Sequence, residues 1–190
     1  MRAMRGQRRG KGPDSAGNGF TLIELLIAAT IFALLALAAG PAYRNWIAAQ
    51  QSTNQAYFLA GAMNQARSEA IKTGQRVNLC KSRDRQTCAD DAGGWESGWI
   101  MFVDENRDGQ VSDGETVVHV EGPSPPGLTV RGNRPVVNYV SYTSLGHARM
   151  LSGALQMGTL TVCQPGQTAL QVVLANSGRA RVQTTRQGCP

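Results

Sequence analysis

The segment NGFTLIELLIAATIFALLALAAGPAY, from Asn18 to Tyr43, sets how the rest of this 190-residue chain is organised. From Phe20 to Ala39 it is mostly apolar and carries one charged side chain, Glu24. About 20 such residues in a helix cross the hydrocarbon core of a bilayer, so we predict a transmembrane helix over residues 20–41. A carboxylate near the centre of such a helix costs roughly 2.5 to 3.5 kcal/mol, and less toward an end, so Glu24 needs a physical explanation.

Three interpretations of residues 1–41 compete. Basic residues outnumber acids before Phe20, as in a secretory signal peptide, and Ala36-Leu37-Ala38 offers a small-residue cleavage site after Ala38. The apolar run, however, is longer than the roughly 7 to 15 residues of a signal core. A plain membrane anchor accounts for the length and for the basic flank, which is typical of the cytoplasmic side, but it leaves Glu24 unexplained.

The third interpretation rests on Gly19-Phe20-Thr21-Leu22-Ile23-Glu24, which resembles the processing site of type IV prepilins. The resemblance implies that a prepilin peptidase removes the basic leader, residues 1–19, by cutting after Gly19, and methylates the new amino terminus at Phe20. In a filament of such subunits, the Phe20 ammonium of one subunit would pair with the Glu24 carboxylate of a neighbour. The charge inside the membrane segment would then be compensated on assembly.

The helical pattern continues beyond Gly40-Pro41, where proline is expected to kink the helix without ending it. Apolar residues recur at helical spacing on one side of the following segment, and polar residues lie on the other. We therefore predict an amphipathic helix over residues 42–74 that packs on a domain and is closed by Thr73-Gly74. The apolar set is Leu59, Met63, Ala66 and Ala70, and the polar set is Asn64, Arg67, Ser68 and Lys72.

After Gly74 the pattern changes to short β-like runs separated by Gly, Pro, Asn and Asp, so residues 75–190 are predicted to form one β-rich head. The fold class is α+β, with a long N-terminal helix on antiparallel sheet. The predicted strands are Val77–Cys80, Trp99–Val103, Thr116–Val120, Leu128–Val130, Val136–Tyr142, Thr159–Cys163, Ala169–Leu174 and Arg179–Gln183.

Three segments of the chain resemble the GspH/FimT family of minor pilins and pseudopilins. They are QARSEAI at residues 65–71, VNLC at 77–80 and GWIMFVD at 98–104. The resemblance covers most of the chain from Gly19 onward and implies the type IV pilin fold. It also implies a single-pass protein of the inner membrane with a periplasmic head, which later joins other pilins in a helical filament.

The four cysteines lack the C-x-x-C spacing of zinc or redox sites, and no histidine lies near them in sequence. A head carried across a membrane reaches an oxidising compartment, where two disulfides are expected. Loop length favours the pairs Cys80–Cys88 and Cys163–Cys189.

The run from Asp104 to Glu115 fits the twelve-residue calcium loop D-x-[DN]-x-[DN]-G-x5-E. Its oxygens would come from Asp104, Asn106, Asp108, the Gln110 carbonyl and Glu115. The flanking segments are strand-like rather than helical, however, and Asp, Asn and Gly also form solvated hairpin loops without an ion. Both interpretations stay open at the level of sequence, and no other cofactor is expected.

Charge is divided unevenly along the head. Residues 82–121 hold ten acids against three arginines, whereas residues 122–190 hold six arginines and no acid. Within the second region, Gly178-Arg179-Ala180-Arg181 resembles the G-R-x-R motif with which FimT-type minor pilins bind DNA. Alternation along a strand would direct Arg179 and Arg181 to one side and Ala180 and Val182 to the core. Arg186 is expected to support them, and the remaining arginines, Arg131, Arg134 and Arg149, to add positive charge.

The resulting expectation is a minor type IV pilin that binds double-stranded DNA through phosphate contacts, without sequence specificity, for uptake in natural transformation. The main alternative is a structural pilin that primes assembly, or a pseudopilin of type II secretion, in which the arginines meet an acidic neighbour. A more distant alternative is a secreted calcium-binding domain. No enzyme activity is expected, because His119 and His147 are isolated and no nucleophile, phosphate-loop or zinc-protease motif is present.

Overall fold

The computed structural model describes residues 19–189. The chain forms two compact units, Met1–Pro41 and Ala42–Pro190. The predicted leader therefore lies outside the described residues, except for Gly19. One helix, α1 (Leu22–Thr73), begins in the first unit and ends in the second.

In the first unit, Thr21 caps the start of α1. Its hydroxyl accepts a hydrogen bond from the Glu24 amide at 3.3 Å, and its carbonyl accepts one from the Leu25 amide at 3.2 Å. Thr21 and Glu24 have the spacing of a capping box, and an acid in the first turn favours the helix dipole. The apolar side chains of this part of α1 are exposed, and the helix is long and apolar enough to cross a membrane.

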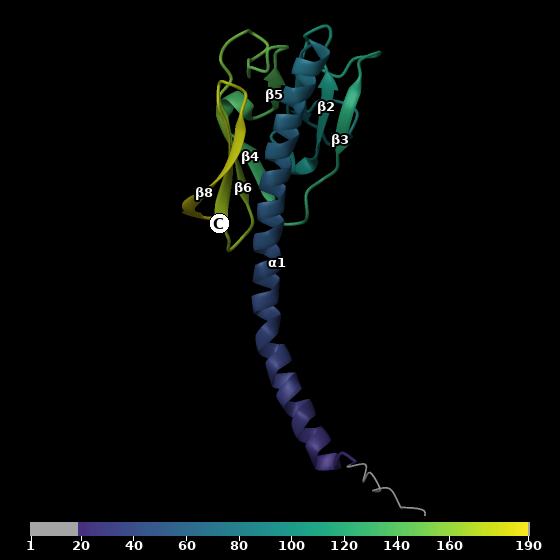
Figure 1. Ribbon diagram of the computed structural model, residues 1–190, viewed down its shortest axis with the longest axis vertical. Coiled ribbons are helices and arrows are strands. Elements are labelled where there is room, and N and C mark those ends of the chain that lie inside the picture. The colour runs from purple at the N-terminus through teal and green to yellow at the C-terminus, as the bar shows by residue number, and fades with distance from the viewer. Residues whose placement is uncertain (1–18, 190) are drawn as a thin grey trace, which may run out of the picture. The chain divides into compact units, whose positions relative to one another are not determined.

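The second unit contains the rest of α1 and two antiparallel four-stranded sheets (Figure 1). The first sheet has the strand order β3-β2-β1-β5 and the second the order β4-β6-β7-β8. Residues of α1 and of both sheets join in one hydrophobic core. The strands are β1 (Val77–Lys81), β2 (Trp99–Val103), β3 (Val117–Glu121), β4 (Thr129–Gly132), β5 (Tyr139–Tyr142), β6 (Gly158–Cys163), β7 (Thr168–Leu174) and β8 (Ala180–Gly188).

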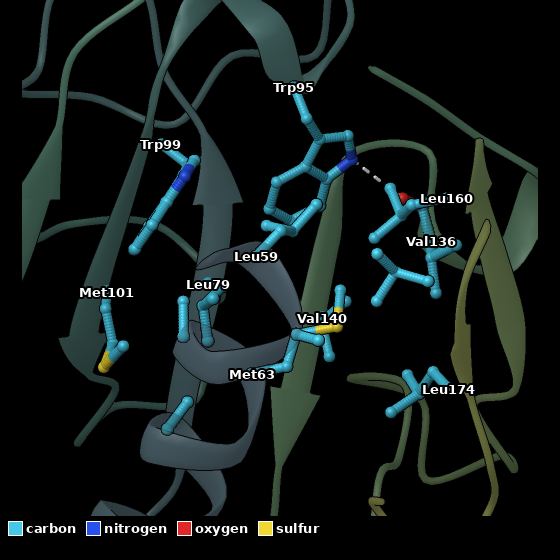
Figure 2. Close-up of a cluster of buried hydrophobic side chains, with 14 of the residues drawn as sticks. Leu59, Met63, Leu79, Trp95, Trp99, Met101, Val136, Val140, Leu160 and Leu174 are labelled. Carbon is cyan, nitrogen blue, oxygen red and sulfur yellow. Dashed lines mark hydrogen bonds between the residues drawn. The ribbon is translucent and has the colours of Figure 1, made fainter. Parts of the chain in front are cut away.

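The predicted apolar stripe of α1 forms the centre of this core. Leu59, Met63, Ala66 and Ala70 are fully buried. Figure 2 shows Leu59 and Met63 between side chains of the first sheet, such as Leu79 and Met101, and side chains of the second, such as Leu160 and Leu174. The helix thus fills the space between the two sheets, which is why one stripe of small and medium apolar residues suffices to join them.

Strands β1 and β2 are buried on both faces. Leu79 and Met101 face α1, whereas Cys80, Ile100 and Phe102 form a second cluster on the other side. That outer cluster is covered by Cys88, which lies in the loop between β1 and β2, and by Val111, which lies in the acid-rich loop after β2. Two loops outside the regular structure are therefore part of the packing of the head.

The predicted elements need correction at three places. The run Val136–Tyr142 is not one strand, because a 3-10 turn over Arg134–Val136 precedes β5 and Pro135 cannot donate a backbone hydrogen bond. The last strand begins one residue later than expected and continues to Gly188. A short 3-10 turn, Trp95–Ser97, was not predicted, and it buries Trp95, whose indole donates to the Val136 carbonyl at 3.0 Å.

Candidate functional site

The Gly178-Arg179-Ala180-Arg181 segment lies at the hairpin that joins β7 to β8. The Ala175 amide donates to the Arg179 carbonyl at 3.0 Å and the Gly178 amide to the Ala175 carbonyl at 2.9 Å, which closes a three-residue loop. Gly178 has φ +83°, and a Cβ there would lie 2.1 Å from the Gly146 carbonyl oxygen. Only glycine fits both requirements, so the hairpin tip can rest directly on the loop after β5.

Two side chains of α1 hold this hairpin in place. The Asn64 side chain accepts from the Ala180 amide at 3.2 Å and donates to the Ala180 carbonyl at 3.3 Å, as a neighbouring strand would. Arg67 donates to the Gly146 carbonyl at 2.9 Å. The sequence pattern had placed both residues on the side of α1 away from the head. Asn64 and its partner are 116 residues apart in the sequence, and Arg67 and its partner are 79 residues apart. Contacts at such separations leave no local sequence pattern, so the sequence could not reveal them.

The arginines face outward, as alternation predicted. Arg179 and Arg181 are exposed, while Ala180 and Val182 pack against the core. Val173 pairs with Arg181 across the hairpin, and Gln171 pairs with Gln183, whose amide group donates to Gln171 at 3.0 Å. A shallow depression of about 350 Å³ is lined by Val173, Ala175, Ser177, Arg179, Ala180 and Arg181.

We call the surface formed by Arg179, Arg181 and Val173, the β7 residue that pairs with Arg181, the arginine face. Within residues 19–189 neither arginine takes part in an ion pair. Arg179 directly precedes β8 and Arg181 lies on it. Two residues of extended chain span roughly 6.5 Å, which is comparable with the spacing of phosphates along a nucleic-acid strand. A guanidinium group can form a bidentate contact with phosphate oxygens.

The other arginines of the acid-free region do not join this face. Arg131 lies on β4, at the opposite edge of the sheet from β8, and binds Glu96 at 2.7 Å. Arg134 lies in the turn that follows β4, and Arg149 is half-buried, with one guanidinium nitrogen fully buried. These three arginines were expected to add positive charge to the head, and their places in the fold show that a lack of acids along the sequence does not by itself gather arginines on one face.

Arg186 is exposed but lies in an irregular part of β8. The register shifts between the pairs Leu170–Thr184 and Thr168–Gly188, and Arg186 falls inside that interval. Seven residues separate it from Arg179, roughly 23 Å along a strand. Arg186 is therefore remote from the hairpin tip, and simple alternation does not assign its side.

Both disulfides are present in the pairing expected from loop length. Cys80 is bonded to Cys88 beside the outer cluster of the first sheet. Cys163 at the end of β6 is bonded to Cys189 directly after β8, and the Cys189 amide donates to the Gln167 carbonyl at 2.8 Å. Strand β8 is thus fixed at its start by Asn64 and at its end by a covalent bond.

The predicted processing and assembly residues lie at the start of the first unit. Gly19 and Phe20 precede α1, and 84% of the Phe20 side chain is exposed. Glu24 is exposed in the first turn of the helix. Farther along α1, in the second unit, Tyr43 and Trp46 are exposed beside Arg44, and their rings lie 6.1 Å apart. Exposed aromatic and basic residues next to an apolar span are typical of the membrane–water interface.

The Asp104–Glu115 loop joins β2 to β3. Asp104 is fully buried, whereas Asn106 and Asp108 are exposed. The Glu115 carboxylate accepts hydrogen bonds from the amides of Glu105 and Ser112, both at 3.0 Å. Among residues 19–189, no three carboxylate, imidazole or thiolate groups converge closely enough to form a ready-made metal centre.

Comparisons with known proteins agree with this architecture. A family model described as type II transport protein GspH matches residues 55–178, and a model of the prokaryotic N-terminal methylation motif matches residues 15–40. A fimbrial protein of Moraxella nonliquefaciens is 37% identical over 76 residues, which are 40% of this chain and 46% of the relative. The chain therefore spans less than half the length of that relative.

Two solved structures are similar to this chain. The type IV minor pilin FimU of Pseudomonas aeruginosa is 18% identical, and the match covers 76% of this chain and 96% of FimU with a TM-score of 0.54. The minor pseudopilin EpsH of the Vibrio cholerae type 2 secretion system is 14% identical over 72% of this chain and 99% of EpsH, with a TM-score of 0.48. The likeness to FimU establishes a type IV pilin fold, as the sequence predicted.

Proposed function

The chain belongs to the family of type II transport protein GspH, and as such it is a minor subunit of the type IV pilin and pseudopilin kind; from that premise we propose that its head binds double-stranded DNA through the arginine face. The observation that carries this proposal is the pair Arg179 and Arg181. Both are exposed on one side of a strand, and no ion pair within residues 19–189 engages them.

The rigidity of the hairpin supports the proposal. Long arginine side chains lose conformational entropy on binding. A backbone that is already fixed beneath them lowers the total entropy cost of binding. Asn64, the Gly178–Gly146 contact and the Cys163–Cys189 bond all hold β8 to elements distant in sequence. The backbone positions from which the two arginine side chains extend are therefore held in place.

Contacts of this kind read phosphate rather than bases. Arginine on phosphate positions a protein on the duplex without sequence information, and the affinity falls steeply with salt. The ligand expected is thus double-stranded DNA of any sequence, as would suit uptake in natural transformation. Trp95 and Trp99 are each only 1% exposed and are unavailable to stack on bases.

A gel-shift series on the full chain in detergent micelles tests the proposal. Arg179→Gln/Arg181→Gln should weaken binding of a duplex at least tenfold at low salt, irrespective of its sequence, because two phosphate contacts are lost. The matched control is Arg85→Gln/Arg134→Gln, which removes the same charge from two exposed arginines on other elements. Equal binding by all three proteins, or an equal loss in both double variants, would contradict a site on β8.

We propose the following route for the chain before it meets DNA. A prepilin peptidase cuts after Gly19 and methylates Phe20, the apolar part of α1 holds the protein in the inner membrane, and Glu24 pairs with the Phe20 ammonium of a neighbouring pilin. The match to the methylation motif over residues 15–40 supports this order of events. Mass spectrometry of the mature protein tests it, because an N-methylated Phe20 terminus differs in mass from a chain that begins at Gly19 or at Ala39.

A second candidate function is structural, because the charges of the head are complementary. Ten acids lie between residues 82 and 121, so the arginine face of one subunit has an acidic partner available on another pilin. In a type II secretion pseudopilus, or as a primer of pilus assembly, Arg179 and Arg181 would serve that contact. The Arg179→Gln/Arg181→Gln variant would then lower incorporation into the filament, while the purified wild type would fail to shift DNA.

A further inference from the structure

The Asp104–Glu115 loop has no part in the proposed DNA site, yet it is held firmly against the head. Val111 packs on the outer cluster formed by Cys80, Ile100 and Phe102. Gly109 has φ +77°, and a Cβ there would lie 2.4 Å from Leu151 Cδ1. The positive φ thus favours glycine at the sixth position of the twelve-residue pattern, the position at which calcium loops make their sharp turn.

Asp104 leaves one carboxylate oxygen without a partner in the interior. Its Oδ2 accepts from the Asn78 side-chain amide at 2.6 Å and from the Gly109 amide at 3.2 Å, so the carboxylate faces the loop. Its Oδ1 is buried and has no hydrogen-bond partner in the described part of the chain, and the same holds for the side-chain oxygen of Asn78. A buried carboxylate oxygen without a donor is costly, and a cation satisfies it directly.

The electrostatics around Asp104 also favour a cation. The carboxylates of Asp104, Asp108 and Glu115 occupy ligand positions of one twelve-residue loop. Carboxylates held in one short loop repel one another. Within residues 19–189 no basic side chain forms an ion pair with any of these three.

We propose that the Asp104–Glu115 loop binds one calcium ion, with the buried Asp104 oxygen as its first ligand. Asn106, Asp108, the Gln110 carbonyl and Glu115 supply the other oxygens at the remaining positions of the pattern. Because Glu115 holds the amides of Glu105 and Ser112, binding requires that this carboxylate turn from those amides to the ion. Calcium suits such an adaptable shell of oxygens better than magnesium, which demands nearly ideal octahedral geometry.

Calorimetry and thermal unfolding of the full chain in detergent micelles test this proposal, after chelation and then titration with calcium chloride. Loops of extracellular modules bind calcium with Kd values on the order of 0.1 to 1 mM. At a tenfold excess over such a Kd, the Tm of the wild type should rise by about 3 to 6 °C, and magnesium should raise it less. Absence of both heat and a Tm shift at about 5 mM calcium would overturn the proposal.

The variants decide whether the ion sits in this loop. Glu115→Gln should abolish the Tm shift, because it removes the charge and the bidentate ligand. Asp113→Asn is the matched control, since it removes the same charge from an exposed residue of the same loop that is not a ligand position, and its shift should equal that of the wild type. Equal shifts in Glu115→Gln and the wild type would overturn the proposal. If Glu115→Gln does not fold, Asp108→Ala at an exposed position should give the same loss.

Discussion

Gly178 is the residue on which the geometry of the arginine face depends most. Gly178→Ala introduces a Cβ into a left-handed backbone and against the Gly146 carbonyl, so we expect a loss of about 3 kcal/mol or more. Gly166→Ala is the matched control, because Gly166 has φ +75° in the preceding turn but nothing within 4 Å of an added Cβ. It should lose only about 1 kcal/mol. Urea unfolding followed by the fluorescence of the buried Trp95 and Trp99 measures the difference, and equal losses would contradict the contact.

Asp104 predicts a pH dependence of stability with a definite sign. Its folded pKa is raised above the ordinary 3.8, so the folded state binds the proton more tightly than the unfolded state. In the absence of calcium, the wild type should therefore lose stability relative to Asp104→Asn as pH rises from about 4 through the raised pKa, and the difference should then become constant. Urea unfolding of both proteins from pH 4 to 8 in chelator gives this difference directly. A difference independent of pH would show that Asp104 is not perturbed.

Residues of the site divide into those that local pattern could predict and those that it could not. Alternation predicted correctly that Arg179 and Arg181 are exposed, because the period of a strand is a local property. Asn64, which fixes Ala180, and the Arg131–Glu96 ion pair depend on the tertiary arrangement alone. A count of charge along the sequence therefore did not indicate which arginines lie on the same face of the head.

Strand β8 is the element that carries the arginine face, and its two ends are secured in different ways. Cys163→Ala/Cys189→Ala opens a loop with a sequence separation of 26, which on the chain-entropy account costs about 3 kcal/mol. Amide exchange should accelerate over residues 183–188, whereas the Arg181 amide stays protected because Asn64 still holds Ala180. DNA affinity should change less than twofold.

The control for this prediction is Cys80→Ala/Cys88→Ala. It removes the other disulfide, which closes a shorter loop beside the first sheet. Exchange in β8 should then match that of the wild type. Faster exchange throughout β8 in the Cys163→Ala/Cys189→Ala protein, Arg181 included, would show that Asn64 does not anchor the strand on its own.

Most elements of the head follow from sequence pattern, and the exceptions have physical causes. Six strands were predicted within two residues of their bounds, because each is an apolar or alternating run flanked by turn residues. The prediction of one strand over Val136–Tyr142 was wrong, because apolar residues continue through a 3-10 turn. In that turn the Val136 carbonyl accepts a hydrogen bond from the Trp95 indole. The extension of β8 to Gly188 depends on its pairing with β7 across an irregular register, which sequence composition does not encode.

At the scale of the whole molecule, the proposed pairing of Glu24 would link membrane insertion to assembly. Glu24→Ala should leave insertion intact or improve it, because a charge is removed from an apolar segment. Incorporation into a filament should fall several-fold, since the neighbour's Phe20 ammonium loses its partner. Fractionation of membranes and of sheared filaments, with immunodetection of the head, measures both quantities. Normal incorporation of Glu24→Ala would contradict the pairing, and Thr21→Ala controls for simple loss of the helix cap.

The architecture of the molecule was predictable from three features: the apolar segment, the stripe of α1 and the β-rich remainder. The proposed DNA contact rests on far fewer residues, because Arg179 and Arg181 define it. We therefore expect most substitutions elsewhere on the surface of the head to leave that contact unchanged.

The salt dependence of DNA binding tests that contact most directly. Fluorescence anisotropy of a labelled duplex, titrated with the full chain in micelles from about 50 to 200 mM sodium chloride, gives the slope of log K against log salt concentration. Arg179→Gln/Arg181→Gln should reduce the slope by about two, one for each lost phosphate contact, while Arg85→Gln/Arg134→Gln keeps the slope of the wild type. Identical slopes for the wild type and the Arg179→Gln/Arg181→Gln variant would contradict DNA binding at the arginine face.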